Sequence, residues 1–345
     1  MANATLPNAP TNLFGSDGKP NYGNFIGPIQ DCNHEAFDYA GLHRWPWTAT
    51  SGLAAKLLKR WQFVGVIDDD LVLGAAVINL NYVGAGFTYA YNRRTGKIIE
   101  KDLKSPLARN TVFSRSASQG VSEIRVGRDF IRMQNTMEDG RRELQIGCGD
   151  RITADVAFTE NGEGISTVTR MAMYGFGHTY KFVGLPATGN VIVNGEKIAL
   201  SKNAMAILDW SSATPPRNTI WNWAAAAGHS NAGKTVGVNF STGLIASGFT
   251  ENTVWVDGKP HMIDGVNFDY NQKDILGEPW RVWSPDGDVD LEFSPDHERF
   301  EDVYLLIAAS RLHQPFGCFR GTIKTGQTTN DVELYGFCEE HFAKW

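Results

Sequence analysis

Short runs that alternate apolar and polar residues recur along most of this 345-residue chain, with Gly, Asn and Asp between them. Examples are residues 123–127, 130–134, 190–195, 253–258 and 289–293. Period-two alternation is typical of half-buried strands, and its regular recurrence between turn residues is typical of antiparallel sheets. Long amphipathic helical patterns are absent from the sequence. The chain is therefore predicted to be all-β, with sheets closed into barrels or sandwiches.

The β-rich region is too long for a single eight-stranded barrel, so we expect two barrel-like units in tandem. Residues 1–60 are punctuated by Gly and Pro and predict a loop-rich N-terminal arm packed on the body. The first unit is placed at 61–190 and the second at 191–345. Their boundary is expected within 185–205, around a hairpin at 189–199.

Composition excludes several classes of protein. A net charge of −6 without a long Lys/Arg run argues against a nucleic-acid binder. The N-terminus lacks a basic region followed by an apolar run, and no apolar run approaches membrane-spanning length, so we expect a cytoplasmic protein without stable membrane insertion. The four cysteines form no C-x-x-C pair and predict free thiols, with a Cys318–Cys338 bridge as the alternative. Nothing in the pattern indicates an oligomeric state.

Two motifs are better explained as turns than as ligand sites. Residues 228–235 match the phosphate-loop pattern G-x-x-x-x-G-K-T, but the residues after them alternate like a strand where that loop needs a helix. Residues 286–290 resemble the start of a calcium loop, without its later Gly and Glu. The histidines show no zinc-type spacing. We expect no nucleotide, no metal and no cofactor; a metal site built from ligands distant in sequence stays open.

The segment 174–255 gathers tryptophans and a few ionisable groups between strand-like runs. Aromatic walls around sparse polar groups are what a pocket for an apolar ligand needs. The candidate residues are His178, Tyr180, Lys181, Asp209, Trp210, Trp221, Trp223, Asn239, Glu251, Asn252 and Trp255. We therefore expect a hydrophobic small molecule as the partner of this protein.

Asp209 is the candidate acid of this segment. It lies between the apolar run 204–208 and Trp210, where desolvation would raise its pKa and equip it to donate a proton. The alternative is a strand-end Asp that caps the turn 211–216. His178 is either its proton partner or a polar residue at a strand edge.

Trp221 and Trp223 share one face of a strand, because side chains two residues apart do so. They line the cavity if that face points inward, and are ordinary core otherwise. Glu251 and Asn252 either hydrogen-bond the head group of a ligand or brace a turn. The residues expected to converge on one cavity, near the start of the second unit, are Asp209, His178, Tyr180, Trp221 and Trp223.

Several short motifs, taken in order, give the chain a family resemblance. They are Leu58-Lys-Arg-Trp61, Leu208-Asp-Trp210, Trp221-Asn-Trp-Ala224, Gly237-Val-Asn-Phe240, Thr250-Glu-Asn252, Asp257-Gly-Lys-Pro-His261, Gln314-Pro-Phe-Gly317 and the tail 334–345. In this order they resemble the domain of unknown function 2804 family over residues 25–345. That family has no settled activity, so the resemblance implies more about fold than about function.

The chain is also distantly similar to the AttH-like proteins and to the carotenoid hydratases (hydroxyneurosporene synthases). These resemble two tandem lipocalin-like barrels of the calycin type, which implies the same fold here. In the hydratases a His and an Asp are implicated in protonating an alkene, and His178 and Asp209 have a similar spacing. Tyr180 stands where a hydratase carries Trp. The resemblance thus implies catalytic roles for these residues.

Two hypotheses follow from different classes of function. The first is a cofactor-free hydratase, cyclase or isomerase acting on an isoprenoid, steroid or aromatic molecule. Asp209 would be the acid and His178 its proton partner, while Tyr180 and the tryptophan faces would stabilise positive charge. The second is a non-catalytic carrier or sensor of a lipid-like ligand, with the same cavity and no need for a tuned acid.

Overall fold

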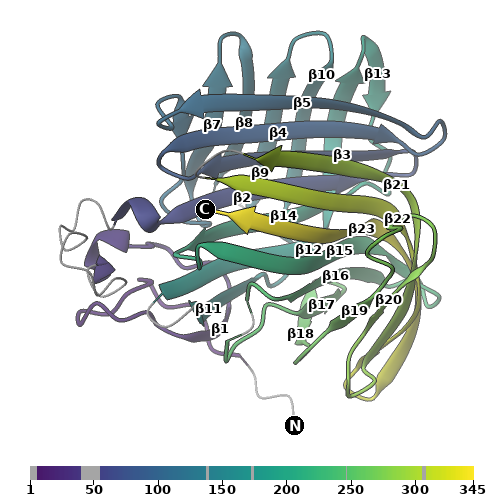
Figure 1. Cartoon of the computed structure of the whole chain (residues 1–345). Coiled ribbons are helices and arrows are strands. Elements are labelled where there is room, and N and C mark those ends of the chain that lie inside the picture. The colour runs from purple at the N-terminus through teal and green to yellow at the C-terminus, as the bar shows by residue number, and fades with distance from the viewer. Residues whose placement is uncertain (1–5, 40–54, 137–139, 172–174, 246, 305–307) are drawn as a thin grey trace.

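The computed structural model consists of antiparallel strands in two sheets (Figure 1). The residues that it describes are 6–39, 55–136, 140–171, 175–245, 247–304 and 308–345. The helical elements within them are short 3-10 turns, η1 (His34–Ala36) and η4 (Ala55–Leu57). No helix in this described part is long and apolar enough to cross a membrane. The all-β prediction is confirmed: one sheet is a nearly closed barrel and the other a half-barrel, consistent with tandem calycin-like barrels.

The first sheet has 14 strands and forms the nearly closed barrel. Its strands are β1 (Gly23–Ile26), β2 (Lys59–Ile67), β3 (Leu71–Asn79), β4 (Val83–Asn92), β5 (Lys97–Pro106), β6 (Thr111–Val112), β7 (Gly120–Val126), β8 (Asp129–Asn135), β9 (Arg141–Cys148), β10 (Ile152–Thr159), β11 (Ile165–Met171), β12 (Gly175–Val193), β13 (Glu196–Ala199) and β14 (Met205–Ala213). The main path is β5-β4-β3-β2-β14-β12-β10-β9-β8-β7-β6. β11 and β13 pair with β12, and β1 pairs with β11.

The long strand β12 takes part in two regions of this barrel. Its first half pairs with β11 and β14, and its second half pairs with β10 and β13. A bulge between Val183 and Leu185 separates the two halves. Gly184 within the bulge has a φ of 89°, which glycine adopts without strain. Because a bulge bends its strand, β12 can pass here from the region with β11 and β14 to the region with β10 and β13.

The second sheet has nine strands and forms the half-barrel. Its strands are β15 (Asn218–Ser230), β16 (Thr235–Thr242), β17 (Thr253–Val256), β18 (Lys259–Met262), β19 (Asn267–Asp269), β20 (Trp280–Trp283), β21 (Val289–Tyr304), β22 (Ala309–Thr325) and β23 (Thr328–Lys344). Their order is β18-β17-β16-β15-β23-β22-β21-β20-β19. The long strands β15, β22 and β23 form its centre.

The two sheets pack together through aromatic side chains. Figure 1 shows β21, β22 and β23 beside β2, β3 and β4 of the barrel. Phe63 of β2 contacts Trp223 and Phe337 of the second sheet, with ring centroids 5.6 and 5.7 Å apart. Tyr89 of β4 contacts Phe316 of β22 at 5.2 Å. The largest cluster of buried apolar side chains therefore extends across both sheets.

The chain changes from the first sheet to the second between β14 and β15. This point lies after the boundary range 185–205 that the sequence pattern indicates, because β14 pairs with both β12 and β2 and so belongs to the first sheet. The expected hairpin at 189–199 is confirmed, with Asn190 opposite Ala199 between β12 and β13. That hairpin lies inside the first sheet.

The N-terminal segment packs on the barrel, as expected for an arm. β1 pairs with β11 through Gly23 opposite Val168, and Leu13 is fully buried. Phe14 packs edge-on against Phe176 of β12, with centroids 4.9 Å apart. Residues 1–5 and 40–54 of the predicted arm lie outside the described residues.

The two motifs that resemble ligand sites are turns between strands. Residues 228–235 form the hairpin between β15 and β16, with His229 opposite Thr235, so a strand follows where a phosphate loop needs a helix. At the β20–β21 turn, the Ser284 hydroxyl donates to Asp286 and Gly287 has a φ of 75°. The four cysteines are all unbridged, including Cys318 and Cys338.

Gly237 of β16 lies where the second sheet touches β12. A Cβ at this position would stand 2.2 Å from the carbonyl oxygen of Val183. Because the backbones would have to separate, Gly237→Ala is expected to lower the free energy of unfolding by about 1–3 kcal/mol, measured by urea unfolding. Gly265→Ala is the control, since open space surrounds that position. Equal losses in the two variants would contradict this close approach of the strands.

Candidate functional site

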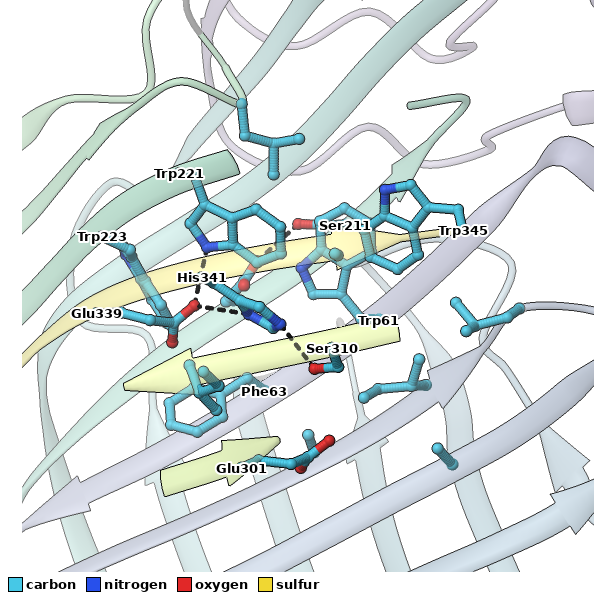
Figure 2. Close-up of a pocket in the computed structure, with 18 of the residues that line it drawn as sticks. Trp61, Phe63, Ser211, Trp221, Trp223, Glu301, Ser310, Glu339, His341 and Trp345 are labelled. Atoms are coloured by element: carbon cyan, nitrogen blue, oxygen red, sulfur yellow. Dashed lines mark hydrogen bonds and ion pairs between the residues drawn. The ribbon is translucent and has the colours of Figure 1, made fainter. Parts of the chain in front are cut away.

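A cavity of about 270 Å³ lies between the barrel and the half-barrel (Figure 2). Strands β2, β3, β4, β12 and β14 line it from one side, and strands β15, β16, β21, β22 and β23 from the other. Its large apolar lining residues include Trp61, Phe63, Phe87, Trp221, Trp223 and Trp345. Its polar lining residues include Lys181, Asp209, Glu251, Ser310, Glu339 and His341. This is the combination of aromatic walls and few polar groups expected of a site for an apolar ligand.

Three tryptophans from distant parts of the chain form an aromatic wall of the cavity. Trp345 is parallel to Trp221, with 2° between the ring planes and 6.3 Å between centroids. It is also nearly parallel to Trp61, at 11° and 6.2 Å. The indole nitrogen of Trp345 donates to the Thr219 hydroxyl, which fixes the orientation of the ring. The wall therefore presents aligned π surfaces to a ligand.

A buried ion cluster joins the barrel side of the cavity, which contributes Lys181 and Asp209, to the connection between β16 and β17, which contributes Glu251. The Lys181 ammonium is 3.0 Å from Asp209 and 3.7 Å from Glu251. All three side chains are at most 5% exposed. The Ser211 hydroxyl donates to Asp209 at 2.7 Å, and the ammonium lies 4.5 Å from the ring centroid of Trp223. One cation thus serves two carboxyl groups in a setting largely without water.

The burial of this cluster changes its proton affinities. Burial raises the pKa of Asp209 and the Glu251 carboxylate adds to the rise, whereas Lys181 and Ser211 act in the opposite direction. Burial lowers the pKa of Lys181, but Asp209 and Glu251 outweigh burial, so the net shift is upward. The lysine therefore stays charged, and Asp209 keeps a proton to higher pH than an ordinary aspartate.

A second polar cluster lies on the half-barrel side. The Glu339 carboxylate accepts hydrogen bonds from the Trp221 indole at 2.8 Å and from the Gln314 amide at 3.1 Å. Its Oε1 is also 3.3 Å from Nδ1 of His341, whose Nε2 is 2.9 Å from the Ser310 hydroxyl (Figure 2). The sequence motifs did not identify these residues as a site. The tail 334–345 contributed only to the family resemblance, although its alternating polar residues are a visible signal.

His178 and Tyr180 do not reach the cavity, so the prediction that they converge there with Asp209 is wrong. Side chains alternate along β12, and the cavity takes Thr179 and Lys181 from this strand. On the opposite face, Nδ1 of His178 is 3.5 Å from the Cys32 sulfur. The Tyr180 hydroxyl donates to Glu160 at 2.8 Å.

The other predicted site residues divide between the cavity and the structure around it. Lys181, Glu251, Trp221 and Trp223 line the cavity. The predicted ligand-binding residues Trp210, Asn239, Asn252 and Trp255 are not among its lining residues.

Those four residues make buried structural hydrogen bonds. Trp210 lies on the far face of β14 and donates to Ser114. Asn239 accepts from the Trp223 indole and donates to the Glu251 carbonyl, so it holds two cavity-lining residues in position without lining the cavity itself. Asn252 accepts from the backbone of Ser241, and Trp255 donates to the Glu163 carbonyl.

The sequence profile of a domain of unknown function, DUF2804, matches residues 6–345, which is nearly the whole chain. This protein belongs to the DUF2804 family. The resemblance noted in the sequence motifs is thereby confirmed. No curated protein matches this DUF2804 chain significantly by sequence.

Solved structures share the fold of this DUF2804 protein at low sequence identity. CghA in a crystal structure with Sch210972 has a TM-score of 0.54 and 10% identity, over 84% of this chain and 89% of CghA. The AttH-like protein NE1406 of Nitrosomonas europaea has a TM-score of 0.54 and 13% identity, over 82% and 92% of the two chains. Kievitone hydratase of Nectria haematococca has a TM-score of 0.52 and 12% identity, over 82% and 88%. These likenesses establish a common fold.

Within the described part of this DUF2804 chain, no three His, Cys, Asp or Glu side chains lie close enough together to hold a metal ion. The side chains that line the cavity offer acid–base chemistry of their own. They include a charged lysine, several carboxyl groups, a histidine and several hydroxyl groups.

Proposed function

We propose that this protein binds a hydrophobic small molecule of isoprenoid, steroid or aromatic type between its two sheets and converts it by cofactor-free proton transfer. Asp209 is the acid. The reaction is of the hydratase, cyclase or isomerase kind. The observation that carries the proposal is the buried pairing of two carboxyl groups, Asp209 and Glu251, with one ammonium, Lys181, in a cavity whose largest side chains are aromatic.

The charge balance of this cluster favours a stored proton. Lys181 neutralises one carboxylate, and a second anion in the same buried space would lack a counter-ion. One oxygen of Glu251 is also buried without a hydrogen-bond partner. A proton held by Asp209, whose pKa is raised by burial, relieves this excess of negative charge and is available to an apolar substrate.

The walls suit the intermediate that such a protonation would generate. Adding a proton to an alkene leaves a carbocation, and aromatic faces attract cations. Trp221 and Trp223 lie on the half-barrel wall of the cavity, and Asp209 lies on the barrel wall. Lys181 and Glu251 are the charged neighbours of Asp209, where the sequence pattern had predicted His178 as its proton partner.

The test begins with the ligand, extracted from purified protein and identified by mass spectrometry. Asp209→Asn is then expected to reduce turnover of that ligand by about 10²–10⁴-fold while leaving its affinity nearly unchanged, because the amide keeps the shape but cannot donate a carboxyl proton. Turnover is followed by chromatography and affinity by tryptophan fluorescence. Turnover retained in Asp209→Asn would contradict the assignment of the acid.

A carrier or sensor is the second candidate, favoured by one observation. Asp209 is held by both Lys181 and Ser211, an arrangement that also serves a purely structural ion pair. On this alternative, the extracted ligand is released unchanged and Asp209→Asn has little effect on its binding. Trp221→Ala would weaken binding on either hypothesis, because it removes part of the apolar wall.

A further inference from the structure

Three residues on neighbouring strands of the half-barrel meet on the cavity side. Glu339 and His341 are two residues apart on β23, so their side chains share a face. Leu312 of β22 lies opposite His341, and Ser310 lies two residues before Leu312, on that same face. Figure 2 shows Glu339, His341 and Ser310 in a line along the cavity wall. All three are lining residues.

The hydrogen bonds around Glu339 determine which atoms donate and which accept between Glu339, His341 and Ser310. The indole nitrogen of Trp221 and the amide nitrogen of Gln314 can only donate, so the Glu339 carboxylate is the acceptor in both hydrogen bonds. It is therefore an acceptor toward His341 as well, which places the ring proton on Nδ1. Nε2 then carries the free lone pair and accepts the hydroxyl proton of Ser310 at 2.9 Å. A histidine activates a serine with this arrangement, in which Nδ1 donates to a carboxylate and Nε2 accepts the hydroxyl proton.

We propose that Ser310 is an activated nucleophile, with His341 as its base and Glu339 as the group that orients the base, and that it accepts acyl groups from hydrophobic esters. The Ser310 oxygen forms a bond to the ester carbonyl carbon while its proton passes to Nε2 of His341. The carbon–oxygen bond to the alcohol then breaks, and the alcohol leaves with that proton. Water then passes a proton to His341 and attacks the acyl carbon, the bond from that carbon to the Ser310 oxygen breaks, the carboxylic acid leaves, and the proton returns from His341 to the serine oxygen.

The surroundings of Ser310 fit an apolar acyl chain. The adjacent lining residues Ala309, Leu312 and Val303 are apolar, and Trp221 packs on the His341 ring with centroids 4.1 Å apart. Lys344 also lines the cavity and pairs in register with Ala309, next to the serine.

The placement of Ser310 explains why the sequence contains no hydrolase motif for it. A G-x-S-x-G elbow lies between a strand and a helix, whereas Ser310 lies within β22, between β21 and β23. A serine–histidine–carboxylate arrangement recurs on unrelated folds and is identified by geometry rather than by spacing in sequence.

The experiment is covalent labelling of the full-length protein with diisopropyl fluorophosphate, followed by peptide mass spectrometry. The Ser310 oxygen would displace fluoride from phosphorus and pass its proton to His341. We expect one adduct, on the peptide containing Ser310, in the wild type and in the control variant Ser294→Ala, which changes a serine of β21 away from the cavity. Ser310→Ala should remove the adduct, and His341→Gln should slow its formation by about 10²-fold or more.

Hydrolysis of p-nitrophenyl butyrate gives a second readout on the same variants. We expect release of p-nitrophenolate to fall by about 10²–10⁴-fold in Ser310→Ala and in His341→Gln, with circular dichroism and melting temperature confirming that both variants are folded. No adduct on the folded wild type, an adduct on another residue, or labelling unaffected by His341→Gln would each overturn the proposal.

Asp209→Asn separates this proposal from the proton-transfer function. Ser310 lies on the half-barrel wall and Asp209 on the barrel wall, and no hydrogen bond of the Glu339 cluster involves Asp209. The variant should therefore be labelled like the wild type. Loss of turnover in Asp209→Asn with normal labelling would leave both proposals intact, whereas labelling abolished by Asp209→Asn would overturn the independence of the serine.

Discussion

Replacing Lys181 by methionine is expected to lower the free energy of unfolding by about 3–5 kcal/mol, because it leaves Asp209 and Glu251 buried without their cation. Methionine fills most of the volume of the lysine stem, so the loss reports the missing charge rather than a large cavity. Urea unfolding at pH 7 measures the effect. Lys197→Met, at an exposed position of β13, is the matched control and should change stability little.

A double variant distinguishes charge from packing in this prediction. Lys181→Met with Asp209→Asn removes the cation and one of its carboxylates, so it should recover part of the loss seen in Lys181→Met alone. The single variant should also approach the wild type as the pH falls and Asp209, whose pKa burial raises, takes up a proton. If Lys181→Met costs no more than Lys197→Met, the cluster is not a buried ion cluster and the charge argument for a stored proton fails.

Strand periodicity made the fold class accessible from sequence, because alternation is a local property. The same alternation also limits which residues can share a site. Asp209 and Trp210 are adjacent in β14, so they point to opposite faces, and they belong to separate environments in the structure. His178 and Tyr180 have the opposite parity to Lys181 in β12. Parity along each strand is therefore enough to separate these residues, and it needs only their sequence positions.

What the sequence could not supply was long-range pairing. β14 joins β2 across more than a hundred residues of chain, which fixes the change of sheet after β14 rather than near the 189–199 hairpin. Glu339 and His341 enter the cavity from the far end of the chain, and Trp345 stacks on Trp61 from the start of the first barrel. Such contacts depend on register between strands that no local pattern specifies.

His178 makes the stability of the fold sensitive to acid. Burial lowers its pKa from 6.5 to about 3, since Nε2 is buried without a partner and Nδ1 meets only the Cys32 sulfur. Between these two pH values the unfolded chain binds a proton that the folded protein does not. The stabilising contribution is thus fully present above pH 6.5 and is lost as the pH falls, at about 1.4 kcal/mol per pH unit, or about 3 kcal/mol by pH 4.

Carboxylates also take up protons over this pH range. Comparing the pH dependence of stability in the wild type and in His178→Met isolates the contribution of the histidine. Urea unfolding between pH 4 and 7 should show that the free energy of unfolding falls less steeply with decreasing pH in His178→Met than in the wild type. The two slopes should differ by about 1.4 kcal/mol per pH unit, the value for one proton. His229→Met, at an exposed position of the β15–β16 hairpin, should keep the slope of the wild type. Since His178 lies behind the cavity wall, a shallower slope in His178→Met together with normal ligand turnover would establish a structural rather than catalytic role. Parallel slopes in all three proteins would mean that the histidine accepts its proton without leaving its place in the core.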